Sequence, residues 1–150
     1  MKILLVIDMQ DKYLPLYDDG LLARVNSRIA EATEEGMQVF YLRNIGRPEN
    51  EAEYSFAEGL LLVSDYVFDK KFPSAFSNED FVEALEDMEV TDIEVIGVDG
   101  NCCVKKTCLD AVEAGYEVHL NLQCTAAKNP KIFEKTLAEL KDKGCRYEQL

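Results

Sequence analysis

Two adjacent cysteines open the stretch of this chain that is best suited to covalent chemistry. The segment GVDGNCCVKKTCLDAVEAGYEV (residues 97–118) places Cys102 and Cys103 after small and turn-forming residues, with Cys108 a little further on. A helix is predicted to begin near Cys102 or Cys103. A thiol at a helix N-terminus faces unpaired N–H groups and the positive end of the dipole, which lower its pKa. Either of the two is a candidate nucleophile, and the alternative is a small buried hydrophobic residue.

A nucleophilic cysteine needs partners, and the one histidine, His119, lies in the alternating run YEVHLNL, where we interpret it as structural. Asp8 ends the apolar run KILLVID and could be a general base if partial burial raises its pKa; the alternative is a turn or capping role. Lys70 and Lys71 follow VFD. A lysine facing a carboxylate and a thiol could stabilise negative charge, the alternative being a solvated surface pair.

Apolar runs and helical spacings alternate along the chain and indicate the elements that position these residues. Strands are predicted over 2–8, 37–44, 92–98 and 116–122, with two short β-prone pieces in 59–72 and a final short strand in 145–150. Helices are predicted over 20–36, 77–90, 103–114 and 129–144. This order predicts an α/β fold of three layers, αβα, with a mostly parallel central sheet. Gly100 and Asn101 are expected to supply unusual backbone angles before the cysteines.

Ligands of such sheets bind beyond the carboxyl ends of the strands. That rule selects Asp8 and Gln10 after the first strand, Asn44 after the second, Lys70 after the apolar region, and residues 99–103.

Composition limits the classes of function. The chain has 150 residues, enough for one domain over 1–150, and a net charge of −13, which argues against nucleic acid or an anionic membrane as partner. Five cysteines without a secretory segment predict a cytoplasmic protein with reduced thiols. No metal is expected, since the chain has no C-x-x-C pair and no second histidine.

Three segments, taken in series, resemble the isochorismatase-like cysteine hydrolases, the superfamily that includes nicotinamidases and N-carbamoylsarcosine amidases. LLVIDMQDKYL (residues 4–14) resembles the opening strand, KKFPSAF (residues 70–76) the lysine segment, and VIGVDGNCCVKKTCLDAVEAGYEV (residues 95–118) the nucleophile segment. The resemblance covers most of the chain in the right order and implies an isochorismatase-like, Rossmann-like single domain.

The resemblance also selects the nucleophile. The catalytic cysteine of this family is followed directly by valine and later by threonine, which here gives Cys103 with Val104 and Thr107. Cys102 falls where a small apolar residue is usual and is interpreted as packing.

The same resemblance implies that Asp8 is the base and Lys70 the third member of an Asp-Lys-Cys triad. It implies a cis peptide at Val98–Asp99 and an oxyanion hole formed by the backbone N–H groups of Asp99 and Cys103. The expected activity is cleavage of a C–N bond in a small amide or ureido compound through a thioester, without a cofactor.

Substrate contacts are expected from position alone at Gln10, Tyr13, Asn44 and Phe76. The partners expected are a small-molecule substrate and further copies of the chain in a homo-oligomer, since members of the family commonly assemble.

Two departures from the family pattern bear on the substrate. Nicotinamidases bind a metal through an aspartate and histidines between the second strand and the lysine segment, and residues 44–66 of this chain contain no histidine. Asp99 stands where a small neutral residue is usual, so its carboxylate is expected either to repel an anionic intermediate or to select a cationic substrate.

Two other readings remain open. The chain could be a non-catalytic or redox-responsive member of the same fold that binds a small ligand, because Cys102, Cys103 and Cys108 could support thiol oxidation. A flavodoxin-like binding domain is disfavoured, since the first strand is followed by the acidic, bulky DMQDKYLP rather than by a glycine-rich phosphate loop.

Overall fold

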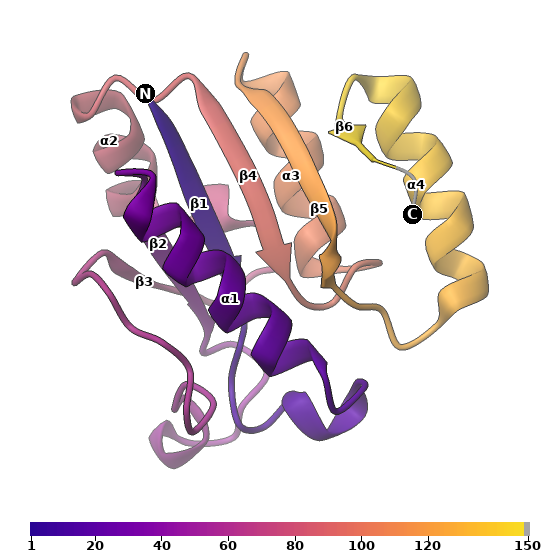
Figure 1. The fold of residues 1–150 in the computed structure, drawn as a ribbon. Coiled ribbons are helices and arrows are strands. Elements are labelled where there is room, and N and C mark those ends of the chain that lie inside the picture. The colour runs from indigo at the N-terminus through magenta and orange to yellow at the C-terminus, as the bar shows by residue number, and fades with distance from the viewer. Residues whose placement is uncertain (149–150) are drawn as a thin grey trace.

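The computed structural model describes residues 1–148, which form a six-stranded sheet in the order β3-β2-β1-β4-β5-β6, with every neighbouring pair parallel (Figure 1). The strands are β1 Lys2–Ile7, β2 Gln38–Asn44, β3 Val67–Lys70, β4 Asp92–Gly97, β5 Glu117–Thr125 and β6 Arg146–Tyr147. The helices are α1 Leu21–Glu34, α2 Glu79–Asp87, α3 Cys103–Glu113 and α4 Pro130–Lys143, with 3₁₀ turns at Leu14–Leu16, Glu51–Glu53 and Ala75–Ser77. The predicted α/β fold is confirmed.

The sheet lies between two layers of helices, because its central strands are apolar on both faces. Side chains at alternate positions of β1 enter opposite cores: Leu4 and Val6 pack with α1, whereas Ile3, Leu5 and Ile7 pack with α2, α3 and α4. Figure 1 shows α1 crossing one face of the sheet while α3 lies on the other. The strands nearest the middle are thereby removed from water, and only their ends are free for chemistry.

Helix boundaries follow local capping chemistry, as the sequence predicts. The side chain of Asn78 accepts a hydrogen bond from the N–H of Phe81 at the start of α2, and Asn129 does the same for Ile132 at the start of α4. Helix α4 ends at Gly144, whose φ of +108° lies in the left-handed region.

The prediction of two β-prone pieces in residues 59–72 is wrong for the first piece. Only Val67–Lys70 joins the sheet, while Leu61, Leu62 and Val63 lie exposed beside its edge. The Tyr41 hydroxyl donates to the Leu61 carbonyl at 2.7 Å and accepts from the Val63 N–H at 3.1 Å. A side chain of β2 therefore takes the backbone bonds that a further strand would need.

The predicted final strand is shorter than residues 145–150. It comprises Arg146–Tyr147, and residues 149 and 150 lie outside the described part of the chain. Within residues 1–148, no helix has the length and apolar character needed to cross a membrane.

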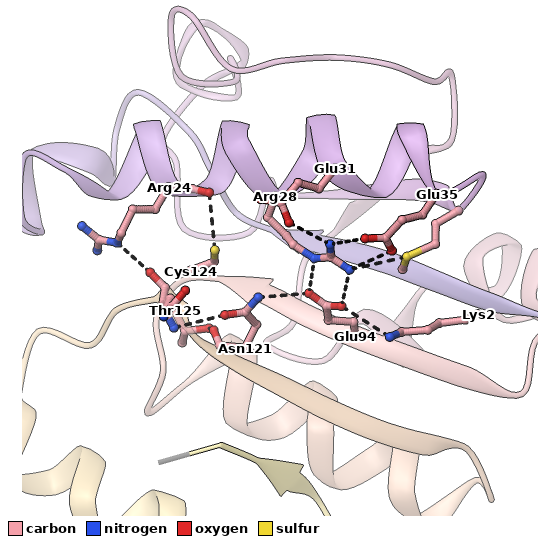
Figure 2. Close-up of polar contacts among 11 residues, drawn as sticks. Lys2, Arg24, Arg28, Glu31, Glu35, Glu94, Asn121, Cys124 and Thr125 are labelled. Carbon is pink, nitrogen blue, oxygen red and sulfur yellow. Dashed lines mark hydrogen bonds and ion pairs between the residues drawn. The ribbon is translucent and has the colours of Figure 1, made fainter. Parts of the chain in front are cut away.

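A buried ion pair joins α1 to the middle of the sheet (Figure 2). Glu94 on β4 is 2% exposed, and Arg28 on α1 donates to both of its carboxylate oxygens, at 2.7 and 2.8 Å. Asn121 of β5 donates to the same carboxylate at 3.1 Å. Burial by itself raises the pKa of Glu94, but the bonds from Arg28 and Asn121 outweigh burial and hold that pKa below its usual value.

We expect Arg28→Ala to lower the free energy of unfolding at pH 7 by about 3 kcal/mol, since it leaves a buried carboxylate without its main partner. The pKa of Glu94 is depressed in the folded state, so the pair contributes fully above the unfolded-state value of about 4.3 and loses its contribution as the pH falls through the folded-state value. Urea denaturation of both proteins at neutral and acidic pH measures the difference, which should shrink in acid.

Arg24→Ala is the matched control, because Arg24 pairs with Asp18 in an exposed contact and should cost less than about 1 kcal/mol. Equal losses for the two arginine variants would contradict a special role for the buried pair.

Candidate active site

Four polar residues gather where the neighbouring strands β3, β2, β1 and β4 end. Asp8 directly follows β1, Asn44 is the last residue of β2, Lys70 is the last residue of β3, and Cys103 is the first residue of α3 after β4. Parallel strands bring their carboxyl ends to the same edge, so residues far apart in sequence meet there.

The Lys70 ammonium is the centre of the cluster. Its Nζ lies 3.0 Å from Asp8 Oδ2 and 3.3 Å from Cys103 Sγ, so that one cation contacts both groups. Asn44 Nδ2 lies 3.8 Å from the same sulfur. All four side chains are buried, and that of Lys70 is fully so. The structure therefore brings Asp8, Lys70 and Cys103 together, whereas Lys71 is exposed.

Unusual backbone conformations place these residues. Asp8 adopts a φ of +53°, a left-handed conformation that is uncommon outside glycine. Gly97, at the end of β4, has a φ of +115°, and a Cβ there would lie 2.1 Å from the Ile7 carbonyl oxygen. The Val98–Asp99 peptide is cis, as the resemblance implies.

The expected special angles at Gly100 and Asn101 are not present, since neither residue has a positive φ. A Cβ at Gly100 would instead lie 2.5 Å from the Phe133 ring of α4. Close packing of a neighbouring helix, and not backbone conformation, requires this glycine.

The electrostatics of Cys103 correct an expectation. Burial and the charge of Asp8 raise the pKa of the Cys103 thiol above its ordinary value, although Lys70 opposes them. The sequence predicts that the helix N-terminus lowers the pKa of this thiol, but that pKa is raised, because the cysteine is buried beside a carboxylate. Burial likewise raises the pKa of Asp8 against the opposing effects of Lys70, Cys103 and Arg47. A protonated thiol needs a base, and Asp8 is in place to be one.

Two backbone N–H groups, one in the turn before α3 and one at its first residue, have no hydrogen-bond acceptor within residues 1–148. Within residues 1–148, the N–H groups of Asp99 and Cys103 donate no hydrogen bond, although their neighbours Cys102 and Val104 both donate to the Asp99 carbonyl at 3.1 Å. Unpaired N–H groups at a helix N-terminus are suited to hold a developing oxyanion.

The Asp99 carboxylate is engaged in holding loops together. It accepts hydrogen bonds from the Tyr17 hydroxyl at 3.0 Å, from the Asn101 N–H at 2.9 Å and from the Lys128 N–H at 2.8 Å. The loops after β1, β4 and β5 thus meet at one side chain. Its oxygens are already partnered, which leaves it poorly suited to select a cationic substrate.

A small cavity of about 60 Å³ opens onto the candidate nucleophile. It is lined by Asp8, Tyr13, Leu16, Tyr17, Asn44, Arg47, Val98, Asp99, Cys102, Cys103 and Lys128. Two of the expected substrate contacts, Tyr13 and Asn44, are in this lining. The Tyr13 hydroxyl is buried and has no hydrogen-bond partner within residues 1–148, which leaves it available to a substrate.

The other two expected contacts lie elsewhere. Gln10 is fully buried, and its amide accepts from the Asn44 N–H at 2.7 Å and donates to the Asn44 carbonyl at 3.1 Å. Phe76 packs against the rings of Phe81 and Tyr116 and lines a separate groove of about 640 Å³. Cys102 lines both the groove and the small cavity.

Sequence reasoning missed Arg47, Tyr17 and Lys128. Arg47 Nη2 lies 3.3 Å from Cys102 Sγ, and its backbone N–H donates to Asn44 Oδ1 at 3.1 Å. Tyr17 and Arg47 lie in loops that follow strands already expected to end at the site, whereas Lys128 follows β5, a strand from which no site residue was expected. Extending the rule on strand ends by a few residues into each loop would have found them.

These observations agree with comparisons to known proteins. The family model described as "Isochorismatase domain" matches residues 2–147. The chain therefore belongs to the isochorismatase family.

The matched share of each chain differs from one relative to another. The chain is 26% identical in sequence to a pyrazinamidase of Pyrococcus horikoshii, which was crystallised in complex with zinc. The structural match covers 99% of this chain and 99% of the pyrazinamidase, with a TM-score of 0.85. The chain is 30% identical to isochorismatase family protein 2A of Dictyostelium discoideum over 92 residues, 61% of this chain and 46% of the relative. It is 32% identical to nicotinamidase 3 of Arabidopsis thaliana over 83 residues, 55% of this chain and 42% of the relative. The matches thus span less than half the length of these two curated relatives.

The pyrazinamidase structure contains zinc, and the needs of a metal site can be compared with the described residues of this chain. Within residues 1–148, no three histidine, cysteine, aspartate or glutamate side chains are grouped so that they could hold a metal ion. The cavity beside Cys103 is lined by two carboxylates, two thiols, two phenols, an amide and two cations, with no histidine among them. The residues present do not fit a nicotinamidase-type metal site.

The charges around Cys103 give a testable prediction. Asp8→Asn should lower the pKa of the Cys103 thiol, because it removes a neighbouring anion, and Lys70→Ala should raise that pKa, because it removes the cation that favours the thiolate. The rate of iodoacetamide alkylation against pH, with peptide mapping, measures both. Cys124 serves as internal control and should be unaffected, because the charges that shift its pKa come from Glu94, Arg24, Arg28 and Glu31 and not from Asp8 or Lys70. Shifts of the same sign in the two variants would contradict this account.

Proposed function

We propose that this protein is a cysteine hydrolase that cleaves the C–N bond of a small amide or ureido-type molecule. The observation that carries the proposal is the buried Lys70 ammonium, within bonding distance of both Asp8 Oδ2 and Cys103 Sγ. Membership of the isochorismatase family and the likeness to a pyrazinamidase support it.

The first half of the proposed reaction forms a thioester. Asp8 takes the proton from the Cys103 thiol as the sulfur attacks the substrate carbon, and the carbonyl oxygen becomes an oxyanion held by the N–H groups of Asp99 and Cys103. Asp8 returns the proton to the nitrogen as the C–N bond breaks, and the amine or ammonia leaves.

The second half releases the acid. Water gives a proton to Asp8 and attacks the thioester carbon, the C–S bond breaks, and the proton returns to the sulfur. The Lys70 ammonium lies beside Asp8 and the Cys103 sulfur, and it favours the negative charge that passes between Asp8 and the substrate oxyanion. Asp8 passes each proton on, first from the thiol to the leaving nitrogen and then from water to the sulfur. The cluster and the bound substrate together therefore keep the same net charge, which avoids a large desolvation penalty.

Substitution of the three residues tests the proposal. Cys103→Ala, Asp8→Asn and Lys70→Ala should each lower kcat for a hydrolysed amide on the order of 10³-fold. When residues act as a unit, removal of any one of them removes most of the rate enhancement of the whole group. A panel of small amides and ureido compounds is scored by ammonia release. Cys124→Ala, a buried cysteine on another part of the sheet, is the matched control and should retain activity.

Intact-mass analysis of wild type mixed rapidly with substrate should show an acyl adduct that maps to Cys103. Full activity in Cys103→Ala would overturn the proposal. No hydrolysis of any panel member, with reversible peroxide oxidation of Cys102 or Cys103, would favour the redox-responsive alternative.

We also propose that the protein is a homo-oligomer. The segment from Leu61 to Val67 exposes several apolar side chains beside edge strand β3, and such a patch is more often covered than left in water. Light scattering should give a multiple of the chain mass, and Leu62→Glu should shift the protein towards the monomer. Ile132→Glu, an exposed apolar residue of α4, is the control. A monomeric wild type would contradict the proposal.

A further inference from the structure

Two cations at the mouth of the catalytic cavity have no acidic partner. Arg47, in the loop after β2, and Lys128, in the loop after β5, both line the cavity of Cys103. Within residues 1–148, neither forms an ion pair, whereas all the other arginines do; these are Arg24, Arg28, Arg43 and Arg146. Acidic side chains outnumber basic ones by 29 to 16, so an unpaired guanidinium beside a nucleophile stands out against a surface rich in possible partners.

The acids that line the same cavity are already engaged, apart from the buried Asp8 Oδ1, which has no hydrogen-bond partner within residues 1–148. Asp8 pairs with Lys70 at 3.0 Å, and the Asp99 carboxylate accepts three hydrogen bonds from its own loops. The charged groups left free to bind something are therefore both positive. The neighbouring groove differs, since Lys105 there pairs with Glu139 at 2.7 Å.

The size of the cavity indicates what the cations would contact. Pockets that enclose a whole small molecule usually measure about 300–1,000 Å³, and this one measures about 60 Å³. It has room for a reacting carbonyl group and its nitrogen. The rest of the substrate must leave through the mouth, where Arg47 Nη2 lies 3.3 Å from the sulfur of Cys102, the residue next to the nucleophile.

We propose that the substrate carries a carboxylate a few bonds from the cleaved C–N bond, and that Arg47, assisted by Lys128, binds it. The substrate class is thus a short amide or ureido acid, neither a neutral aromatic amide nor a cation. That the bound anion is part of a substrate rests on the proposed function, but the existence of the anion site does not depend on turnover. A guanidinium recognises a carboxylate through two parallel N–H bonds, which fixes direction as well as charge.

Two alkylating reagents of nearly the same size test the anion site without any hydrolysis. Iodoacetate carries a carboxylate and iodoacetamide a neutral amide, so the ratio of their rates at Cys103, followed by peptide mapping, reports attraction of an anion. Arg47→Gln should lower this ratio about tenfold and Lys128→Gln by a smaller factor, whereas Arg47→Lys should keep part of the preference. Raising the salt concentration from about 0.01 M to about 1 M should lower the wild-type ratio more than that of Arg47→Gln.

Lys143→Gln is the matched control. It removes the same charge from an exposed lysine without an ion pair in residues 1–148, at the end of α4 far from the carboxyl ends of the strands, and should leave the ratio unchanged. An Arg47→Gln ratio equal to that of wild type, or an equal fall in Lys143→Gln, would overturn the inference.

Hydrolysis of the monoamide of succinic acid is then compared with that of its neutral diamide. A preference for the acid that is lost in Arg47→Gln through a higher KM, with kcat largely kept, is the expected result. An Arg47-dependent alkylation ratio with no hydrolysis of either compound would leave the anion site standing and count against the proposed function. Hydrolysis of both compounds, with an alkylation ratio that Arg47→Gln does not change, would support the proposed function and overturn the anion site.

Discussion

The site depends on one buried cation shared between two acids. Lys70 Nζ contacts Asp8 Oδ2 at 3.0 Å and Cys103 Sγ at 3.3 Å, and its side chain is fully buried. An ammonium removed from water is stable only with a negative partner, and one cation can balance only one anion. The cluster therefore holds one negative charge, on Asp8 or on Cys103, and the other group keeps a proton. Reciprocal protonation of a base and a nucleophile follows from charge balance and needs no histidine.

The order of the strands makes that cluster possible. Adjacent strands β3, β2, β1 and β4 supply, in turn, Lys70, Asn44, Asp8 and the turn that leads to Cys103. The rest of the fold keeps these ends in register. Apolar cores on both faces fix the middle of the sheet. The Arg28–Glu94 pair attaches α1 to β4, the strand that precedes the candidate nucleophile (Figure 2).

Much of this arrangement could be predicted from the sequence, because apolar runs ending in Asp8 and Asn44 mark buried strands whose ends must meet. The state of the Cys103 thiol could not, since its pKa depends on depth of burial and on the distance to Asp8, and neither is written in local sequence. Residues 60–63 have the composition of a strand, yet they lie outside the sheet, where backbone groups of Leu61 and Val63 bond to the hydroxyl of Tyr41. Arg47 was overlooked because a loop arginine usually points to solvent.

The lysine at the centre of the site lies on the most weakly held strand of those that build it. Strand β3 has four residues and pairs only with β2, so its outer edge has no ladder of hydrogen bonds to resist fraying. Short edge segments open at a smaller free energy than the core. Opening of the Asp8–Lys70–Cys103 cluster and loss of the fold are then separate events, because the buried cation can be withdrawn while the central strands stay paired. Any partner that covers this edge raises the free energy of that local opening, so that binding at the edge and integrity of the buried cluster are thermodynamically linked.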